Sequence, residues 1–125
     1  MKNMFVYGSL KKGCFNHSLI SENSRNRLIR KGFISGYKMY LLYSYPALKP
    51  SSEEDKISVE LYSLSDEVFE RIDKMEQRAN YVPVEVEDDA GKKGIIYLYK
   101  GEVKESNIVL FGNWTRKNEK LNIVD

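Results

Sequence analysis

Apolar and polar residues alternate along several short segments of the chain, which is the two-residue period of half-buried β-strands. Gly32 and Gly36 interrupt the longest of these segments and indicate bends or bulges, and Pro46 is expected to end it. The cluster 88–91 predicts a tight turn, so the last two strands form a hairpin. The predicted strands cover residues 4–7, 28–45 with its interruptions, 57–62, 81–87 and 94–99.

One segment changes to the period of an amphipathic helix. Ser65 is a residue type that caps helix N-termini, and two acidic residues follow it where the helix dipole favours negative charge. A helix is therefore predicted over 65–78, and a shorter helical turn is expected over 16–20 with Asn16 as its cap. The apolar stripe of the longer helix consists of Val68, Phe69, Ile72 and Met75.

The composition describes one small domain, spanning residues 1–125. Hydrophobic residues make up 42% of the chain and charged residues 30%, and the net charge of +2 gives no argument for a polyanionic partner. Cys14 is the only cysteine, which excludes an internal disulfide and a cysteine zinc cluster. No segment has the length of a signal peptide or a membrane span, so we expect a cytoplasmic protein without membrane contact. Nine tyrosines suit a pocket that needs apolar rings with polar tips.

Glu76 is the most informative charged residue of the predicted helix. It follows Ile72 by four positions and Phe69 by seven, so its carboxylate projects from the apolar side. Burial of an unpaired carboxylate is costly and raises its pKa toward the range useful for acid–base catalysis. The same position also fits a fraying last turn that points to water, and Asp73, at the edge of the stripe, is a second candidate carboxylate. The helix pattern leaves these alternatives open.

The first apolar run, 4–7, ends in the segment Tyr7–Leu10. A strand that ends at a glycine turn leaves successive backbone N–H groups, and such groups can converge on an anion. Ser9 in this turn is expected to bond to local backbone, because no Gly-x-Ser-x-Gly motif surrounds it. His17 is the only histidine, and its spacing from Ser9 makes a Ser-His-acid triad awkward.

Four motifs, the first of them containing the segment Tyr7–Leu10, occur in order along residues 4–114. They are Val6–Leu10 with Asn16-His17, Tyr45–Ala47, Val59–Tyr62 and Ile72–Glu76. In combination they resemble the γ-glutamylcyclotransferase-like family, and the chain is most similar to its short γ-glutamylamine cyclotransferase branch.

This resemblance implies a mixed α+β fold around a small, partly antiparallel β-barrel with short flanking helices. It also implies an enzyme of lyase or acyltransferase chemistry that works without metal or cofactor. In the implied reaction the α-amine of a γ-glutamyl amine or amide attacks the γ-carbonyl and releases 5-oxoproline. Glu76 would be the general acid and base, and the substrate-binding residues would be Tyr7, Gly8, Ser9, Leu10 and Tyr81.

Two departures from the family pattern concern the expected pocket rim. Gln77-Arg78 stand where Gly-Tyr often follows the catalytic glutamate, and Pro83 replaces an arginine. They leave the identity of the γ-glutamyl compound open. They also leave room for an alternative, a non-catalytic module that binds a small carboxylate on the same fold.

The expected partner is a small γ-glutamyl molecule, and the protein is expected to be a monomer or weak homodimer. A nucleic-acid binder is the third hypothesis, because arginines and lysines lie among the tyrosines. The nearly neutral net charge and the lack of an RNA-recognition motif argue against it.

Overall fold

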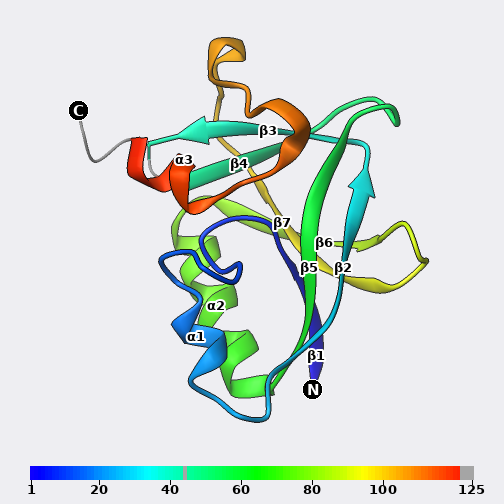
Figure 1. Ribbon diagram of the computed structural model, residues 1–125, viewed down its shortest axis with the longest axis vertical. Helices are drawn as coiled ribbons and strands as arrows, with labels where there is room; N and C mark the ends of the chain where they lie inside the picture. Colours follow the sequence, from blue (N-terminus) through cyan, green and yellow to red (C-terminus); the bar gives the residue numbers. More distant parts are fainter. Residues whose placement is uncertain (44, 122–125) are drawn as a thin grey trace.

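The computed structural model describes residues 1–43 and 45–121 and contains a curved five-stranded sheet with a long helix packed on one side (Figure 1). The strand order is β2-β5-β1-β7-β6. β1 and β7 are parallel, and the other neighbours are antiparallel. The mixed α+β class and the partly antiparallel sheet are therefore confirmed. The strands are β1 (Lys2–Val6), β2 (Arg27–Ser35), β5 (Lys56–Leu64), β6 (Tyr81–Glu87) and β7 (Lys93–Tyr99).

A separate two-stranded ribbon consists of β3 (Tyr37–Leu42) and β4 (Tyr45–Pro50). The prediction that Pro46 ends a strand is wrong, because Pro46 lies within β4, opposite Leu41. Both strands of a two-stranded ribbon are edge strands, where a residue without an N–H is tolerated. Gly36, with φ of +96°, separates β2 from β3 as expected.

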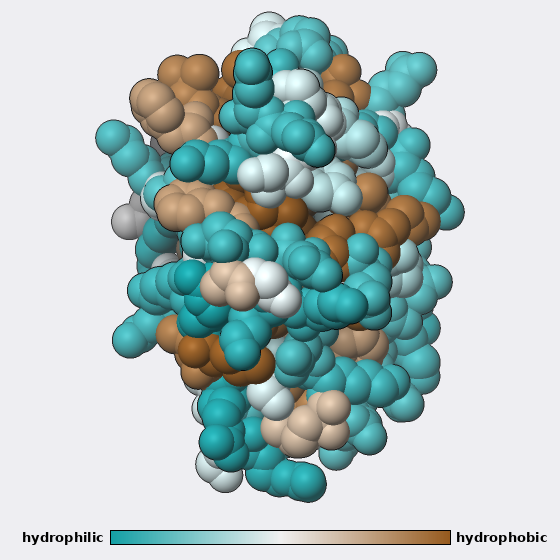
Figure 2. All heavy atoms as spheres, turned by 90° about the vertical axis from the view of Figure 1, so that its right-hand side faces the viewer, coloured by the Kyte–Doolittle hydropathy of each residue, from teal (hydrophilic) through white to brown (hydrophobic). Residues whose placement is uncertain are grey.

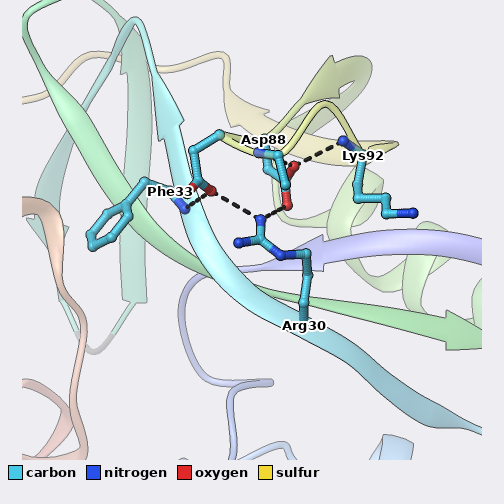
Figure 3. Close-up of polar contacts among 6 residues, drawn as sticks. Arg30, Phe33, Asp88 and Lys92 are labelled. Atoms are coloured by element: carbon cyan, nitrogen blue, oxygen red, sulfur yellow. Dashed lines mark hydrogen bonds and ion pairs between the residues drawn. The ribbon is translucent and has the colours of Figure 1, made fainter.

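The five-stranded sheet does not close into a barrel, so this part of the fold prediction is wrong. A barrel requires strand pairing around the whole sheet, whereas within residues 1–43 and 45–121 no ladder joins the edges β2 and β6. The turn after β6 bridges to β2 instead (Figure 3). The Asp89 N–H donates to the Phe33 carbonyl and its Oδ1 accepts from the Phe33 N–H, both at 2.9 Å, and Arg30 pairs with Asp88 and Asp89.

The long helix is α2 (Asp66–Arg78), close to the predicted range. Ser65 is its N-cap and accepts a hydrogen bond from the Val68 N–H at 3.3 Å, as its residue type predicts. The short turn near the N-terminus is α1 (Ser18–Ser21), whose N-cap is His17 rather than Asn16. The Asn16 side chain is used elsewhere, because it donates to Ser9 Oγ.

Two clusters of buried side chains lie on the two faces of the sheet. Successive residues of β1 point to opposite faces, so Met4 and Val6 join the cluster under α2 while Phe5 and Tyr7 join the other. The end of β1 therefore lies between the two halves of the core. Its position fixes where the following loop begins.

The remaining elements are short: the 3₁₀ turns η1 (Glu105–Asn107) and η2 (Leu110–Gly112), and α3 (Arg116–Leu121). Across residues 1–43 and 45–121, none of the helices is long and apolar enough to cross a membrane. Figure 2 faces the side that carries β2, and hydrophobic side chains there form several patches among hydrophilic ones. Leu28, Ile29 and Phe33 of β2 are exposed.

Candidate active site

One cavity of about 410 Å³ lies where the end of β1, the C-terminal end of α2 and the β3–β4 turn meet. It is lined by every residue that the sequence nominated for the site: Tyr7, Gly8, Ser9, Leu10, Glu76 and Tyr81. These residues come from three separate parts of the chain: the loop after β1, the end of α2 and the start of β6. The fold thus brings together a helical carboxylate and the loop after the first strand.

Glu76 reaches the cavity from the last turn of α2 and is partly buried. Burial raises the pKa of its carboxyl group to about 7. Across the described part of the chain, no hydrogen bond or cation counters this effect. The alternative that the carboxylate points into bulk water from a frayed turn does not fit this position.

Asp73, the second candidate carboxylate, has a structural role. Its Oδ1 accepts a hydrogen bond from the Tyr97 hydroxyl at 2.6 Å, and its Oδ2 accepts one from Gln77 Nε2 at 2.8 Å. It does not line the cavity. Both of its oxygens are therefore engaged with the protein, which leaves Glu76 as the carboxylate that faces the cavity.

The loop Tyr7–Leu10 turns its carbonyl groups toward the protein. Gly8 O accepts from the Lys11 N–H at 3.0 Å, Ser9 O from the Asn16 N–H at 2.8 Å, and Leu10 O lies 2.8 Å from His17 Nδ1. Within the described residues, the N–H groups of Gly8, Ser9 and Leu10 have no acceptor. Three adjacent amide donors at the wall of a cavity can hold a carboxylate or a developing oxyanion.

Ser9 and His17 do not form a catalytic pair. Ser9 Oγ accepts from Asn16 Nδ2 at 3.0 Å, and His17 Nδ1 is engaged with the Leu10 carbonyl. Both side chains thus stabilise the loop. Ser9 does so through the Asn16 side chain rather than through local backbone, which corrects the expectation from the sequence. Cys14 is equally unsuited to nucleophilic chemistry, because burial and the nearby Glu119 raise the pKa of its thiol to about 11.

Tyrosine rings form much of the cavity wall, and three of their hydroxyls bond to the protein. Tyr7 donates to the Tyr97 carbonyl at 2.7 Å, Tyr81 donates to the Pro46 carbonyl at 2.6 Å, and Tyr97 donates to Asp73. Burial raises the pKa of all three hydroxyls, and Glu76 raises it further. They stay protonated near neutral pH and position their rings rather than exchange protons.

The cavity also contains residues that sequence reasoning did not assign to it. Six of the nine tyrosines of the chain line it, so the tyrosine content was the available signal. Gln77 and Pro83, two of the departures from the family pattern, are exposed and do not line it, and Arg78 lies in an adjoining shallow groove. The residues not foreseen are chiefly Leu42, Tyr43, Tyr45, Tyr97 and Tyr99.

Comparison with known proteins identifies the family of the chain. Residues 4–116 match the family model described as gamma-glutamyl cyclotransferase, AIG2-like. The chain is 36% identical over 77 residues to the gamma-L-glutamyl-butirosin B gamma-glutamyl cyclotransferase of Niallia circulans. The aligned residues cover 62% of this chain and 47% of that protein. It is 34% identical over 87 residues to a putative gamma-glutamylcyclotransferase of Pyrococcus horikoshii, covering 70% of each. The chain belongs to the AIG2-like gamma-glutamyl cyclotransferase family.

Solved structures show the same fold. A crystal structure of the Pyrococcus horikoshii protein has a TM-score of 0.78 and 25% identity, and covers 99% of this chain and 97% of that one. A crystal structure of an AIG2-like protein from Mus musculus has a TM-score of 0.69 and 19% identity. The match covers 84% of this chain and 81% of that one. The family resemblance seen in the sequence motifs is therefore confirmed. The match to the Niallia circulans enzyme spans about half the length of that relative.

Proposed function

We propose that this protein is a cyclotransferase that releases 5-oxoproline from a γ-glutamyl amine or amide. The observation that carries the proposal is the cavity shared by the Glu76 carboxylate, whose pKa is about 7, and the amide donors of Gly8, Ser9 and Leu10. Family membership and the names of the relatives support γ-glutamyl cyclotransferase activity in general.

The reaction needs little covalent chemistry from the protein. The α-amine and the γ-carbonyl belong to one substrate molecule, so the cavity has to fold the γ-glutamyl group into attack geometry. Such orientation can recover about 7–11 kcal/mol of a reaction barrier. The amide donors of the loop would hold the α-carboxylate or the oxygen on which negative charge develops.

Glu76 would handle the protons. As a carboxylate it takes a proton from the α-ammonium group, and the freed nitrogen forms a bond to the γ-carbon. The bond from that carbon to the leaving nitrogen then breaks as Glu76 returns the proton to it. The ring nitrogen gives up its second excess proton to water, and the departing amine takes one up from water. Overall the ring nitrogen loses two protons and the leaving amine gains two, so none is consumed. A pKa of about 7 suits both directions of transfer near neutral pH.

The departures from the family pattern do not weigh against activity. Gln77 and Pro83 do not line the cavity, and the Arg78 side chain lies in the groove beside it. The cavity wall around Glu76 is formed largely by tyrosines and by residues of the loop Tyr7–Leu10. We therefore favour a working enzyme over the non-catalytic carboxylate-binding module.

The test is Glu76→Gln, assayed for 5-oxoproline release from γ-glutamyl ethylamide. Because the amide cannot take up the proton, we expect the rate to fall by about 100- to 10,000-fold while the fold is retained. Glu70→Gln, an exposed carboxylate on the same helix, is the matched control and should keep full activity. A Glu76→Gln variant near the wild-type rate contradicts the assignment. Wild type that binds 5-oxoproline but releases none from any γ-glutamyl amide supports the binding module instead.

A further inference from the structure

Two tyrosines stand at the mouth of the cavity. Tyr43 and Tyr45 flank the β3–β4 turn and line the cavity, yet their residues remain 81% and 53% exposed. Tyr43 adopts a φ of +54°, a left-handed conformation that bulky residues rarely occupy. Such strained residues cluster at ligand-binding positions. Two tyrosines at the cavity thus remain more than half exposed.

The part of the described cavity wall between this mouth and Glu76 contains no charged side chain. Apart from Glu76, the described residues that line the cavity include no aspartate, glutamate, lysine, arginine or histidine. The hydroxyls of Tyr7, Tyr81 and Tyr97 are used in bonds to the protein, so these residues offer ring surface. A charged group on the leaving amine, lying against this wall away from Glu76, would lose water without gaining a counter-ion, which is costly.

The cavity has two ends: a reacting end with Glu76 and the loop amides, and a mouth with Tyr43 and Tyr45. If the γ-glutamyl group lies between Glu76 and the amides of the loop, the leaving amine extends toward the β3–β4 turn. We propose that this amine carries an aromatic or bulky apolar group that packs against Tyr43 and Tyr45. The inference rests on the proposed cyclotransferase function and specifies its substrate class.

A basic groove beside the cavity offers the competing interpretation. Arg71, Lys74 and Arg78 lie along α2 and border the cavity through Met75 and Ala79. They would favour an anionic leaving amine. None of the three lines the cavity, and Arg71 also faces Glu67 at 3.8 Å. The aromatic mouth is therefore the better-supported contact.

The test compares γ-glutamyl 2-phenylethylamide with γ-glutamyl ethylamide on the full chain, by release of 5-oxoproline. Both leaving groups are primary alkyl amines, so the pair differs mainly in the ring. We expect kcat/KM to be about tenfold or more higher for the phenylethylamide, the range that a small apolar contact supplies. Equal values, or faster turnover of γ-glutamylglycine or γ-glutamyl-ε-lysine than of the phenylethylamide, overturn the inference and leave the cyclotransferase function standing.

Variants locate the preference. In Tyr43→Ala and Tyr45→Ala the ratio of the two kcat/KM values should fall severalfold, whereas the corresponding phenylalanine variants should keep it. Phe111→Ala is the control, because Phe111 is 92% exposed and lies outside the cavity lining. An unchanged ratio in both alanine variants contradicts the inference.

Failure of the proposed function gives a different result. If no γ-glutamyl amide releases 5-oxoproline, the affinities of wild type for the same two amides are measured by calorimetry. Tighter binding of the phenylethylamide keeps the aromatic mouth as a binding surface. Equal affinities overturn that assignment as well.

Discussion

The ring of Pro46 occupies the space that a side chain on Gly8 would need. A Cβ at Gly8 would lie 2.9 Å from Pro46 Cδ and closer still to Cγ. Gly8 does not adopt a positive φ, so the site requires glycine for room rather than for backbone freedom. The Pro46 carbonyl also accepts the Tyr81 hydroxyl. The contact between Gly8 and Pro46 thus holds the loop, β4 and β6 together at the cavity.

Gly8→Ala should destabilise the protein because the rigid proline ring cannot move aside. We expect the free energy of unfolding to fall by about 1–3 kcal/mol, the usual cost of overpacking. Denaturant unfolding measures it. In the double variant with Pro46→Ala the penalty of the added methyl group should shrink, since its partner is removed. Strictly additive effects of the two substitutions would contradict the contact.

Glu76→Gln should make the protein more stable at pH 8. The pKa of Glu76 is raised to about 7 in the folded protein, above its ordinary value near 4.3, so the folded state binds the proton more tightly. The buried charge therefore destabilises the fold increasingly as pH rises from about 4 through 7. We expect a gain of about 1–3 kcal/mol at pH 8 that disappears near pH 4. Glu70→Gln should stay within about 0.5 kcal/mol of wild type at both pH values.

The activity of the wild-type enzyme should rise with pH through an ionisation near 7. Below this pH Glu76 is protonated and cannot accept the proton of the α-ammonium group. A profile of kcat/KM against pH should therefore lose about tenfold per pH unit on the acid side. Glu70→Gln should show the same acid limb. A flat profile between pH 5 and 7 would rule out Glu76 as the base.

Lys11, which follows the loop and does not line the cavity, should stabilise the loop. Its Nζ donates to the Trp114 carbonyl at 2.8 Å and to Asn113 Oδ1 at 3.0 Å, and burial lowers its pKa. Lys11→Met removes both bonds, so thermal unfolding should show a loss of about 1–3 kcal/mol. The neighbouring Lys12 has an exposed side chain, and Lys12→Met should change stability by less than about 0.5 kcal/mol. Equal effects of the two variants would contradict the bridging role.

Asp88→Ala should open the contact between the turn after β6 and the edge strand β2. Burial alone would raise the pKa of Asp88, but bonds from the Lys92 and Ala90 N–H groups and from Arg30 hold it below its ordinary value. We expect a loss of about 1–3 kcal/mol at pH 7. Because the stabilisation belongs to the carboxylate, the difference from wild type should shrink as pH falls below about 4.

Measurement of unfolding by urea at pH 7 and pH 3 checks this prediction. Glu87→Ala is the matched control, since Glu87 is exposed and reaches Lys93 only at 3.8 Å. It should stay near wild type at both pH values. A Glu87→Ala loss as large as that of Asp88→Ala would show that the turn is sensitive to any lost charge.

Local patterns along the chain were sufficient for much of the fold and for the catalytic candidate. The cap at Ser65, the stripe through Ile72 and the turn at 88–91 predicted α2 and the β6–β7 hairpin, because these elements depend on residues close in sequence. The same helical period placed Glu76 on the apolar side. The motif resemblance then identified the family and nominated the loop Tyr7–Leu10, which lines the same cavity.

Only the tertiary structure decided what depends on residues distant in sequence. It showed that the sheet stays open, bridged by Arg30 and Asp88 rather than closed by strand pairing. It distinguished Glu76 from Asp73, because the Tyr97 hydroxyl, from β7, donates a hydrogen bond to the Asp73 carboxylate. It also brought the β3–β4 turn to the cavity mouth. The period of a segment tells which of its faces is buried, but the partners that bury that face are set by packing across the whole molecule.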